Sequence, residues 1–181
     1  MELKRYSDLL ASVRHDRDFH SITSLVQPDD LEVREVAEVL YQARDFIKAS
    51  QDFVNSFTTY RKEIGDYWAT PAEILKKRAG DCDDKAILLC SLLRNYIEPE
   101  RVFCAFGHWS QNGKVDGHMW VVTEGGMEDR IIEATASPDS PLRGRYNLEA
   151  IFNDRYAFSY PEGIVHFNLL PVKAEGGGAY G

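Results

Sequence analysis

The chain has 181 residues and a mass of 20.6 kDa, which is the size of one domain built around one hydrophobic core. Hydrophobic residues make up 44% of the sequence and aromatic residues 12%, far more than a disordered chain carries. The formal net charge of −8 repels phosphate backbones and anionic lipid surfaces. The composition therefore predicts a globular protein and excludes nucleic acid as a preferred partner.

We expect a cytoplasmic protein. The longest apolar run, residues 86–90, is far shorter than the roughly 18 residues that a membrane-spanning helix needs. Residues 1–8 lack the apolar stretch of a secretory signal. The three cysteines, Cys82, Cys90 and Cys104, form no Cys-x-x-Cys pair, which is typical of free thiols in a reducing compartment.

The first part of the chain is predicted to be helical. Residues 1–30 are polar and mixed, and we expect one or two short helices there. Apolar residues then recur at helical intervals from 30 to 57, after a capping-box pair at Asp29 and Glu32. This pattern predicts one long amphipathic helix, which we interpret as a packing element.

Two further helix starts follow. Residues 70–73, Thr-Pro-Ala-Glu, combine a cap, a proline at the first helical position and a capping-box glutamate. They predict a short helix that ends near Gly80. Asp81 is a good cap for the next helix, so Cys82 is expected in its first turn.

After Pro99 the hydrophobic period becomes that of strands. Two turns, Asn112-Gly113 and Gly125-Gly126, separate three predicted strands that form an antiparallel meander, namely 102–106, 119–122 and 130–134. Further on we expect a short helix over 148–152 capped by Asn147, a last strand within 163–172, and a flexible glycine-rich tail over 173–181.

The position of Cys82 indicates a nucleophile. A cysteine reacts as its thiolate, and a helix N-terminus and a neighbouring imidazole both favour that form. A Gly125-Gly126 turn would pair Glu124 with Met127 and would place His118 directly opposite Glu133. These residue types in this order predict a Cys-His-Glu triad.

The Asn112-Gly113 turn places Gly107 opposite His118 and turns His108 to the other face. Gly107 then has two interpretations. It leaves open space for a substrate above the imidazole, or it marks a bulge in the strand.

Other interpretations remain open at this point. Asp81, Asp83 and Asp84 fit helix capping and dipole complementation better than the spread ligands of a calcium loop. Cys82, His118 and Glu133 are also residue types that bind zinc. The aromatic residues Tyr146, Phe152, Tyr156, Phe158 and Tyr160 either pack in the core or wall a substrate groove.

Four motifs resemble the transglutaminase-like superfamily of papain-fold cysteine enzymes. They cover about residues 66–136 and are Trp68–Leu75, Gly80–Ala86, Gly117–Val121 and Glu133–Thr135. The resemblance implies Cys82 as nucleophile, His118 as general base and acid, and Glu133 as the orienting acid. The family most often has Asp at this last position, within Asp-x-Thr.

The resemblance also implies acyl transfer through a thioester. The Cys82 backbone N–H would hold the oxyanion, together with the indole of Trp68 or Trp120. A core position for Trp68 is the alternative. Gly107 would line the substrate space.

The expected fold is α+β, with helices packed on an antiparallel sheet in a papain-like, transglutaminase-like core. Residues 1–172 would form one domain, with 1–57 as a helical extension and 58–172 as the catalytic core. The expected function is a hydrolase or acyltransferase acting on amide bonds of a protein or peptide substrate, without cofactor, metal, nucleic acid or membrane. A catalytically silent interaction module is the alternative.

Overall fold

The computed structural model describes residues 22–62, 67–124, 129–136, 142–159 and 165–167, and all structural statements below concern these residues. The predictions for residues 1–21, for the Gly125-Gly126 turn and for the tail at 173–181 lie outside them.

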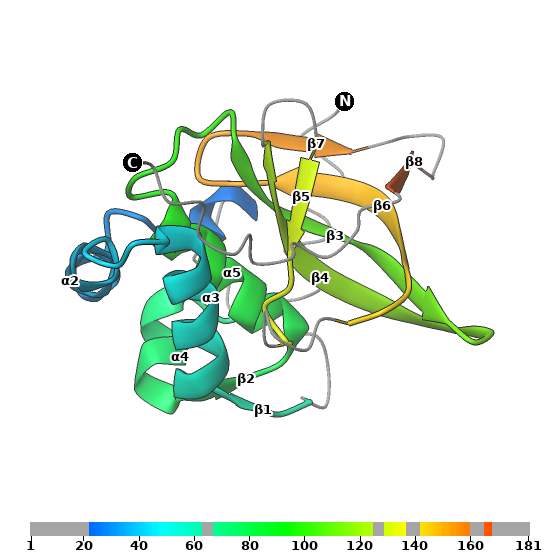
Figure 1. The fold of residues 1–181 in the computed structure, drawn as a ribbon, viewed down its shortest axis with the longest axis horizontal. Coiled ribbons are helices and arrows are strands. Elements are labelled where there is room, and N and C mark those ends of the chain that lie inside the picture. The colour runs from blue at the N-terminus through cyan, green and yellow to red at the C-terminus, as the bar shows by residue number, and fades with distance from the viewer. Residues whose placement is uncertain (1–21, 63–66, 125–128, 137–141, 160–164, 168–181) are drawn as a thin grey trace, which may run out of the picture.

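One antiparallel sheet forms one layer of the described structure, as the sequence predicts (Figure 1). Its strand order is β5-β4-β3-β6-β7, and β8 pairs with the other end of β6. The strands are β3 (Val102–Gln111), β4 (Lys114–Glu124), β5 (Asp129–Ile132), β6 (Arg145–Phe152), β7 (Ala157–Ser159) and β8 (Val165–Phe167).

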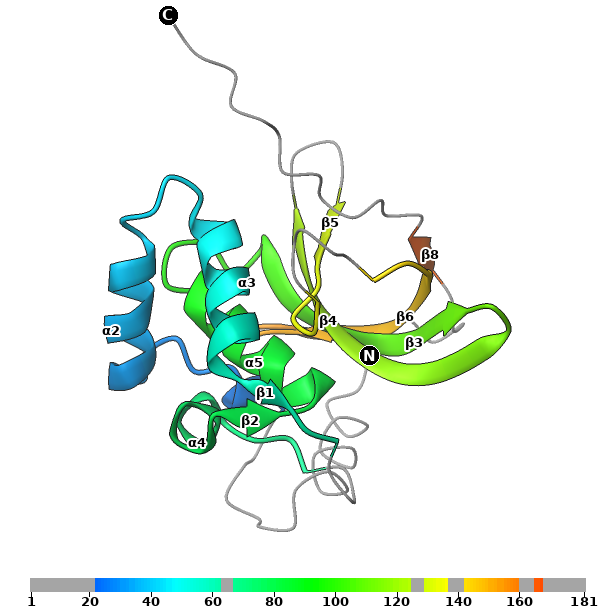
Figure 2. The same cartoon turned by 60° about the horizontal axis from the view of Figure 1, so that its bottom comes forward.

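The helices form a second layer beside this sheet (Figures 1 and 2). They are the 3₁₀ helix η1 (Ile22–Leu25) and the α-helices α2 (Leu31–Leu40), α3 (Phe46–Phe57), α4 (Pro71–Lys77) and α5 (Cys82–Leu93). A short parallel pair, β1 (Thr59–Tyr60) and β2 (Ala79–Gly80), joins the segments that lead into α4 and α5. Within the described residues, no helix is long and apolar enough to cross a membrane.

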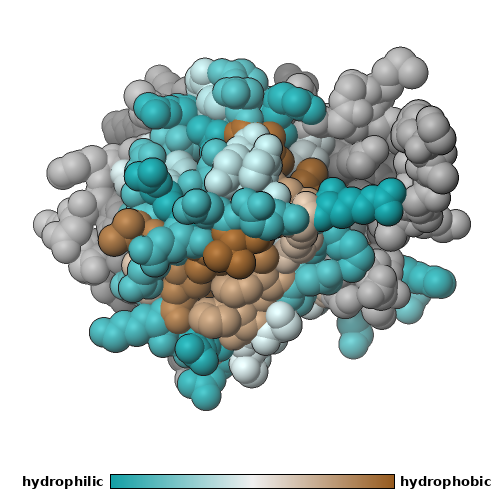
Figure 3. Space-filling model, turned by 60° about the vertical axis from the view of Figure 1, so that its left-hand side comes forward, coloured by the Kyte–Doolittle hydropathy of each residue, from teal (hydrophilic) through white to brown (hydrophobic). Residues whose placement is uncertain are grey.

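Helix α5 is the centre of the fold. Every residue from Asp84 to Leu93 is buried, because α2, α3 and α4 pack on one side of α5 and strands β3 and β4 on the other. Figure 3 views the molecule from the side of the helices. Hydrophobic residues gather there in one large patch, and hydrophilic residues surround it. A helix buried on all sides holds its N-terminus in a fixed place, which matters for Cys82.

The prediction of one long helix over 30–57 is wrong. The chain forms α2 and α3 instead, because Asp45 adopts an extended backbone and its side chain accepts a hydrogen bond from the Lys48 N–H, which begins a new helix. The periodicity missed the break because Leu40 and Ile47, on either side of it, pack against the same core.

The helix starts at Thr70 and Asp81 are confirmed, with one difference. The Thr70 side chain and Glu73 form the full capping box, and α4 ends at Lys77, with Arg78 in the left-handed conformation. Asp81 occupies the N-cap of α5, but its side chain makes no capping hydrogen bond. The N–H groups in the first turn of α5 therefore receive no hydrogen-bond acceptor from the Asp81 side chain.

The predicted helix over 148–152 is also wrong, because this segment belongs to strand β6. Tyr146, Leu148, Ala150 and Phe152 alternate with less buried residues along the strand. That is the period of two expected for a strand with one buried face. Asn147 is a strand residue rather than a cap.

The first hairpin has the predicted register. Asn112 and Gly113 both have positive φ, 51° and 80°, as a two-residue turn of this twist requires. Gly107 consequently pairs with His118 and His108 with Gly117. This register fixes the position of His118 on β4.

Gly107 lies at a bulge of the strand. The pairing of β3 with β6 shifts register between Phe106 and Gly107. A Cβ atom at Gly107 would lie 2.0 Å from the Asn147 carbonyl oxygen, whereas one at Gly117 would meet nothing within 4 Å.

We therefore expect Gly107→Ala to destabilise the protein by about 3 kcal/mol, since the overlap is with backbone and must displace β6. Gly117→Ala is the matched control and should change the free energy of unfolding by less than about 1 kcal/mol. Urea denaturation of both variants measures this. Equal effects of the two substitutions would contradict the packing argument.

Candidate active site

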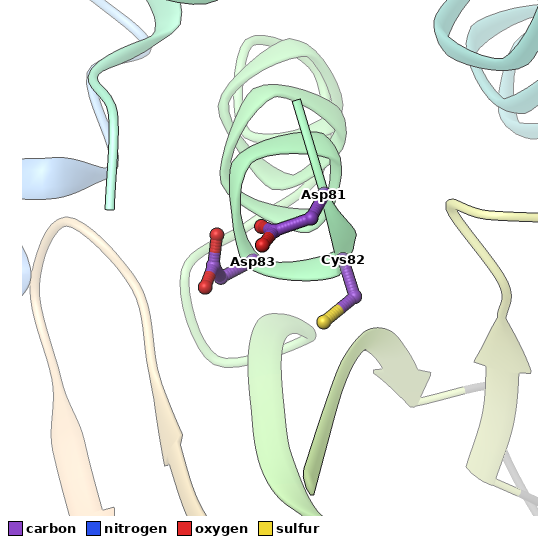
Figure 4. Close-up of side chains that lie close together, drawn as sticks. All are labelled: Asp81, Cys82 and Asp83. Carbon is purple, nitrogen blue, oxygen red and sulfur yellow. The ribbon is translucent and has the colours of Figure 1, made fainter. Parts of the chain in front are cut away.

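Cys82 is the first residue of α5 and lines an open cleft of about 630 Å³. Its thiol is free and partly exposed, whereas Cys90 and Cys104 are buried. The sulfur lies beside the carboxyl groups of Asp81 and Asp83, within 4.8 Å of an oxygen atom of each (Figure 4). The N-terminal N–H groups of a helix have no intrahelical acceptor, so the end of α5 presents donors and a positive dipole beside this sulfur.

His118 and Glu133 meet as predicted, but by a different register. Val121 pairs with Ile132 and Glu124 with Asp129, so β4 and β5 are shifted by two residues from the predicted pairing. A shift of two keeps side chains on the same face, whereas a shift of one would have separated them. His118 and Glu133 are thus diagonal rather than directly opposed, with His118 Nε2 3.1 Å from Glu133 Oε1 and 3.0 Å from Oε2.

The carboxylate of Glu133 is buried yet well partnered. Besides the imidazole, it accepts hydrogen bonds from the Tyr146 hydroxyl at 2.8 Å and the Thr135 hydroxyl at 2.9 Å. Burial alone would raise the pKa of Glu133, but these hydrogen bonds and the charge of His118 lower it below its usual value. Glu133 is therefore ionised at neutral pH.

His118 is held as an imidazolium. Burial lowers its pKa, but hydrogen bonds with Cys82 and Glu133 and the negative charge of both groups raise it to about 10. Because Nε2 faces Glu133, Nδ1 is the ring nitrogen left for Cys82. The arrangement links sulfur, imidazole and carboxylate in series, which is the geometry of a nucleophile, a base and its orienting acid.

The other predicted site residues divide into two groups. Trp68 and Gly107 line the cleft. The Trp68 ring packs against Phe106 and Phe152 and is 6% exposed, which supports the core interpretation of that residue. Trp120 is 1% exposed, and its ring stacks on that of His118 at 6.1 Å, so it supports the imidazole instead of facing a substrate.

Sequence reasoning missed the role of Tyr146. It was one of several aromatic residues at irregular spacing, and nothing local distinguishes it. The structure places it on β6, across β3 from His118, with its hydroxyl on Glu133. Burial and the charge of Glu133 raise the pKa of Tyr146 far above its usual value, so the phenol stays a donor. His108 lies apart from the triad and pairs with Glu149 at 2.8 Å.

Asp81 and Asp83 approach each other beside Cys82 (Figure 4). Burial, the hydrogen bond with Asp81 and the surrounding negative charges raise the pKa of Asp83 far above its usual range. Asp83 is therefore protonated at neutral pH. The hydrogen bond between the two side chains explains why Asp81 does not cap the helix.

A family model described as the CEP76 peptidase-like domain matches residues 66–155, about half of the chain. A comparison with curated proteins gave no significant match. Three solved structures of LapG from Legionella pneumophila are similar in fold. The EGTA-treated form has a TM-score of 0.54 at 16% identity, covering 88% of this chain and 86% of that one.

The two other LapG structures agree with this alignment. One has a TM-score of 0.52 at 17% identity and covers 90% of both chains. The calcium-bound form has a TM-score of 0.51 at 17% identity and covers 94% of both. The chain thus has the transglutaminase-like, papain-like fold of cysteine peptidases.

Neither calcium nor zinc fits the described side chains well. Calcium takes six to eight oxygen ligands, and the cluster beside Cys82 supplies two carboxyl groups, of which that of Asp83 is protonated. For zinc, Glu133 lies on the far nitrogen of His118, so the triad atoms do not converge on one point.

Glu133→Gln should lower the pKa of His118 from about 10 by about 2 pH units, because the buried imidazolium loses its counter-charge. Tyr146→Phe should lower it less, since it removes only a donor to the carboxylate. NMR titration of the His118 ring measures both. An unchanged titration in Glu133→Gln would contradict the proposed ion pair.

The same pair predicts how stability depends on pH. A folded-state pKa raised from 6.5 to about 10 means that protonated His118 contributes fully to stability below pH 6.5, and that this contribution is lost as the pH rises through about 10. Glu133 remains ionised over this range. The difference in urea unfolding free energy between wild type and His118→Gln should shrink steadily from pH 6 to pH 10.5, and a constant difference would refute the linkage.

Proposed function

We propose that the protein is a cysteine hydrolase that cleaves amide bonds in a protein or peptide through Cys82, His118 and Glu133. The observation that carries the proposal is the contact of His118 with the buried Glu133 carboxylate at 3.0 Å, in the same cleft that Cys82 lines from a helix N-terminus. The fold supports it, because this architecture is that of cysteine peptidases.

In the first half of the reaction, the Cys82 thiolate attacks the amide carbonyl and forms a tetrahedral oxyanion. The His118 imidazolium gives its proton to the leaving nitrogen, the C–N bond breaks, and an amine departs from a thioester. In the second half, neutral His118 takes a proton from water, whose oxygen attacks the thioester. The C–S bond breaks, a carboxylic acid is released, and the thiolate–imidazolium pair is restored.

The oxyanion would be stabilised by the end of α5. The Cys82 N–H belongs to the first turn, where helical N–H groups have no acceptor within the helix. The Asp81 side chain makes no capping hydrogen bond, so it does not occupy the N–H groups of that turn. Preorganised donors of this kind typically contribute about 3 kcal/mol to lowering the barrier.

Alkylation with iodoacetamide, followed by peptide mass spectrometry, tests the reactive pair. At pH 6 we expect Cys82 to be labelled at least about tenfold faster than Cys90 and Cys104, which are buried and serve as internal controls. His118→Ala should abolish that preference. Equal labelling of Cys82 in both proteins would refute the thiolate–imidazolium pair.

Acylation tests turnover separately. Incubation with 4-nitrophenyl acetate should leave one acetyl group on Cys82, which water then removes, and Cys82→Ser should lose the thioester. If Cys82 is labelled by iodoacetamide but no acyl adduct forms, the hydrolase proposal fails. A catalytically silent interaction module is then the better interpretation.

A further inference from the structure

Glu133, the acid of the triad, lies just after the last residue of β5 that pairs with β4, so backbone pairing does not fix its position. The last pair between β4 and β5 is Val121 with Ile132, so Glu133 follows the end of the ladder. The segment 133–136 has no strand assignment, and β5 is the edge strand of the sheet. Something other than β-pairing must fix this short segment.

Side chains from α3 bind the main chain of that segment. Gln51 Nε2 donates to the Glu133 carbonyl at 2.9 Å and to the Ala136 carbonyl at 3.3 Å. Asn55 Nδ2 donates to the same Ala136 carbonyl at 2.9 Å. The two side chains stand one helical turn apart on one face of α3, so both reach the segment together.

A buried lysine fixes the orientation of the Asn55 amide. Lys85, on α5 one turn after Cys82, is 2% exposed, and its Nζ lies 3.5 Å from Asn55 Oδ1 and 3.4 Å from the Thr58 carbonyl. An ammonium group only donates, so the Asn55 oxygen must face Lys85 and its NH₂ must face Ala136. The burial of Lys85 lowers its pKa, while the charge of Glu133 raises it.

We propose that Gln51 and Asn55 are positioning residues that hold the 133–136 segment so that the Glu133 carboxylate meets His118. The proposal rests on the proposed use of the triad, and extends its machinery to α3. Neither Gln51 nor Asn55 lines the cleft, so both act through Glu133. Hydrogen bonds of this kind set an acid to within a fraction of an ångström, and small misplacements in active sites cost large factors in rate.

Three variants test this assignment. Gln51→Met keeps the size of the side chain and removes both donated hydrogen bonds. Asn55→Leu keeps the size of the side chain, adds no charge and removes the donor to Ala136. Ser56→Ala is the matched control, because it removes an exposed hydrogen bond within α3 and touches nothing in the 133–136 segment.

The first readout is the NMR titration of His118 in the resting protein, after thermal unfolding has shown each variant to be folded. The pKa of His118 should fall by about 1 pH unit in Gln51→Met and Asn55→Leu and should not change in Ser56→Ala. A merely structural role would lower thermal stability without moving this titration. An unchanged titration in the two test variants, or an equal fall in the control, would overturn the proposal.

The second readout is the rate of Cys82 acetylation by 4-nitrophenyl acetate, which should fall about tenfold in the two test variants only. The NMR titration of His118 is measured in the resting protein, so it does not depend on catalytic activity. If wild type is not acetylated but the His118 titration moves as expected, the hydrolase proposal fails while the positioning assignment stands. If wild type is acetylated and the titration is unmoved, the positioning assignment alone is wrong.

Discussion

A carboxylate kept charged inside the protein constrains much of this structure. Glu133 is 5% exposed, and an isolated buried charge costs several kcal/mol unless it is neutralised and hydrogen-bonded. The chain meets that requirement with an imidazolium from β4, a phenol from β6 and the Thr135 hydroxyl. The three donors come from different segments, so the site forms only when β4, β3 and β6 have paired and residues 133–136 lie beside them.

The parts of the site with local causes were predictable from sequence. A Gly-Asp pair before an apolar helix placed Cys82 at a helix start, and the Asn112-Gly113 turn fixed His118 opposite Gly107. The prediction for Glu133 used a register that is wrong by two residues. It still brought the acid to His118, because alternation along strands depends only on whether the shift is odd or even.

The parts with distant causes were not predictable. Tyr146 contacts Glu133 only because β6 pairs with β3, and residues 148–152 of that strand were expected to be a helix. The break between α2 and α3 depends on Asp45, whose capping role competes with an uninterrupted apolar period. In each case long-range packing or a single polar side chain outweighed the periodicity of the segment.

The hydrogen bonds from α3 to the 133–136 segment bear on where the functional unit begins. The region that the family model recognises starts at residue 66, after α3 has ended at Phe57. A fragment cut at that boundary would retain the cysteine, the histidine and the glutamate, yet would lack the helix that binds the main chain around the glutamate. Comparisons confined to residues 66–155 leave α3 out, so they do not register a substitution at Gln51 or Asn55, although both side chains bind the main chain around the glutamate.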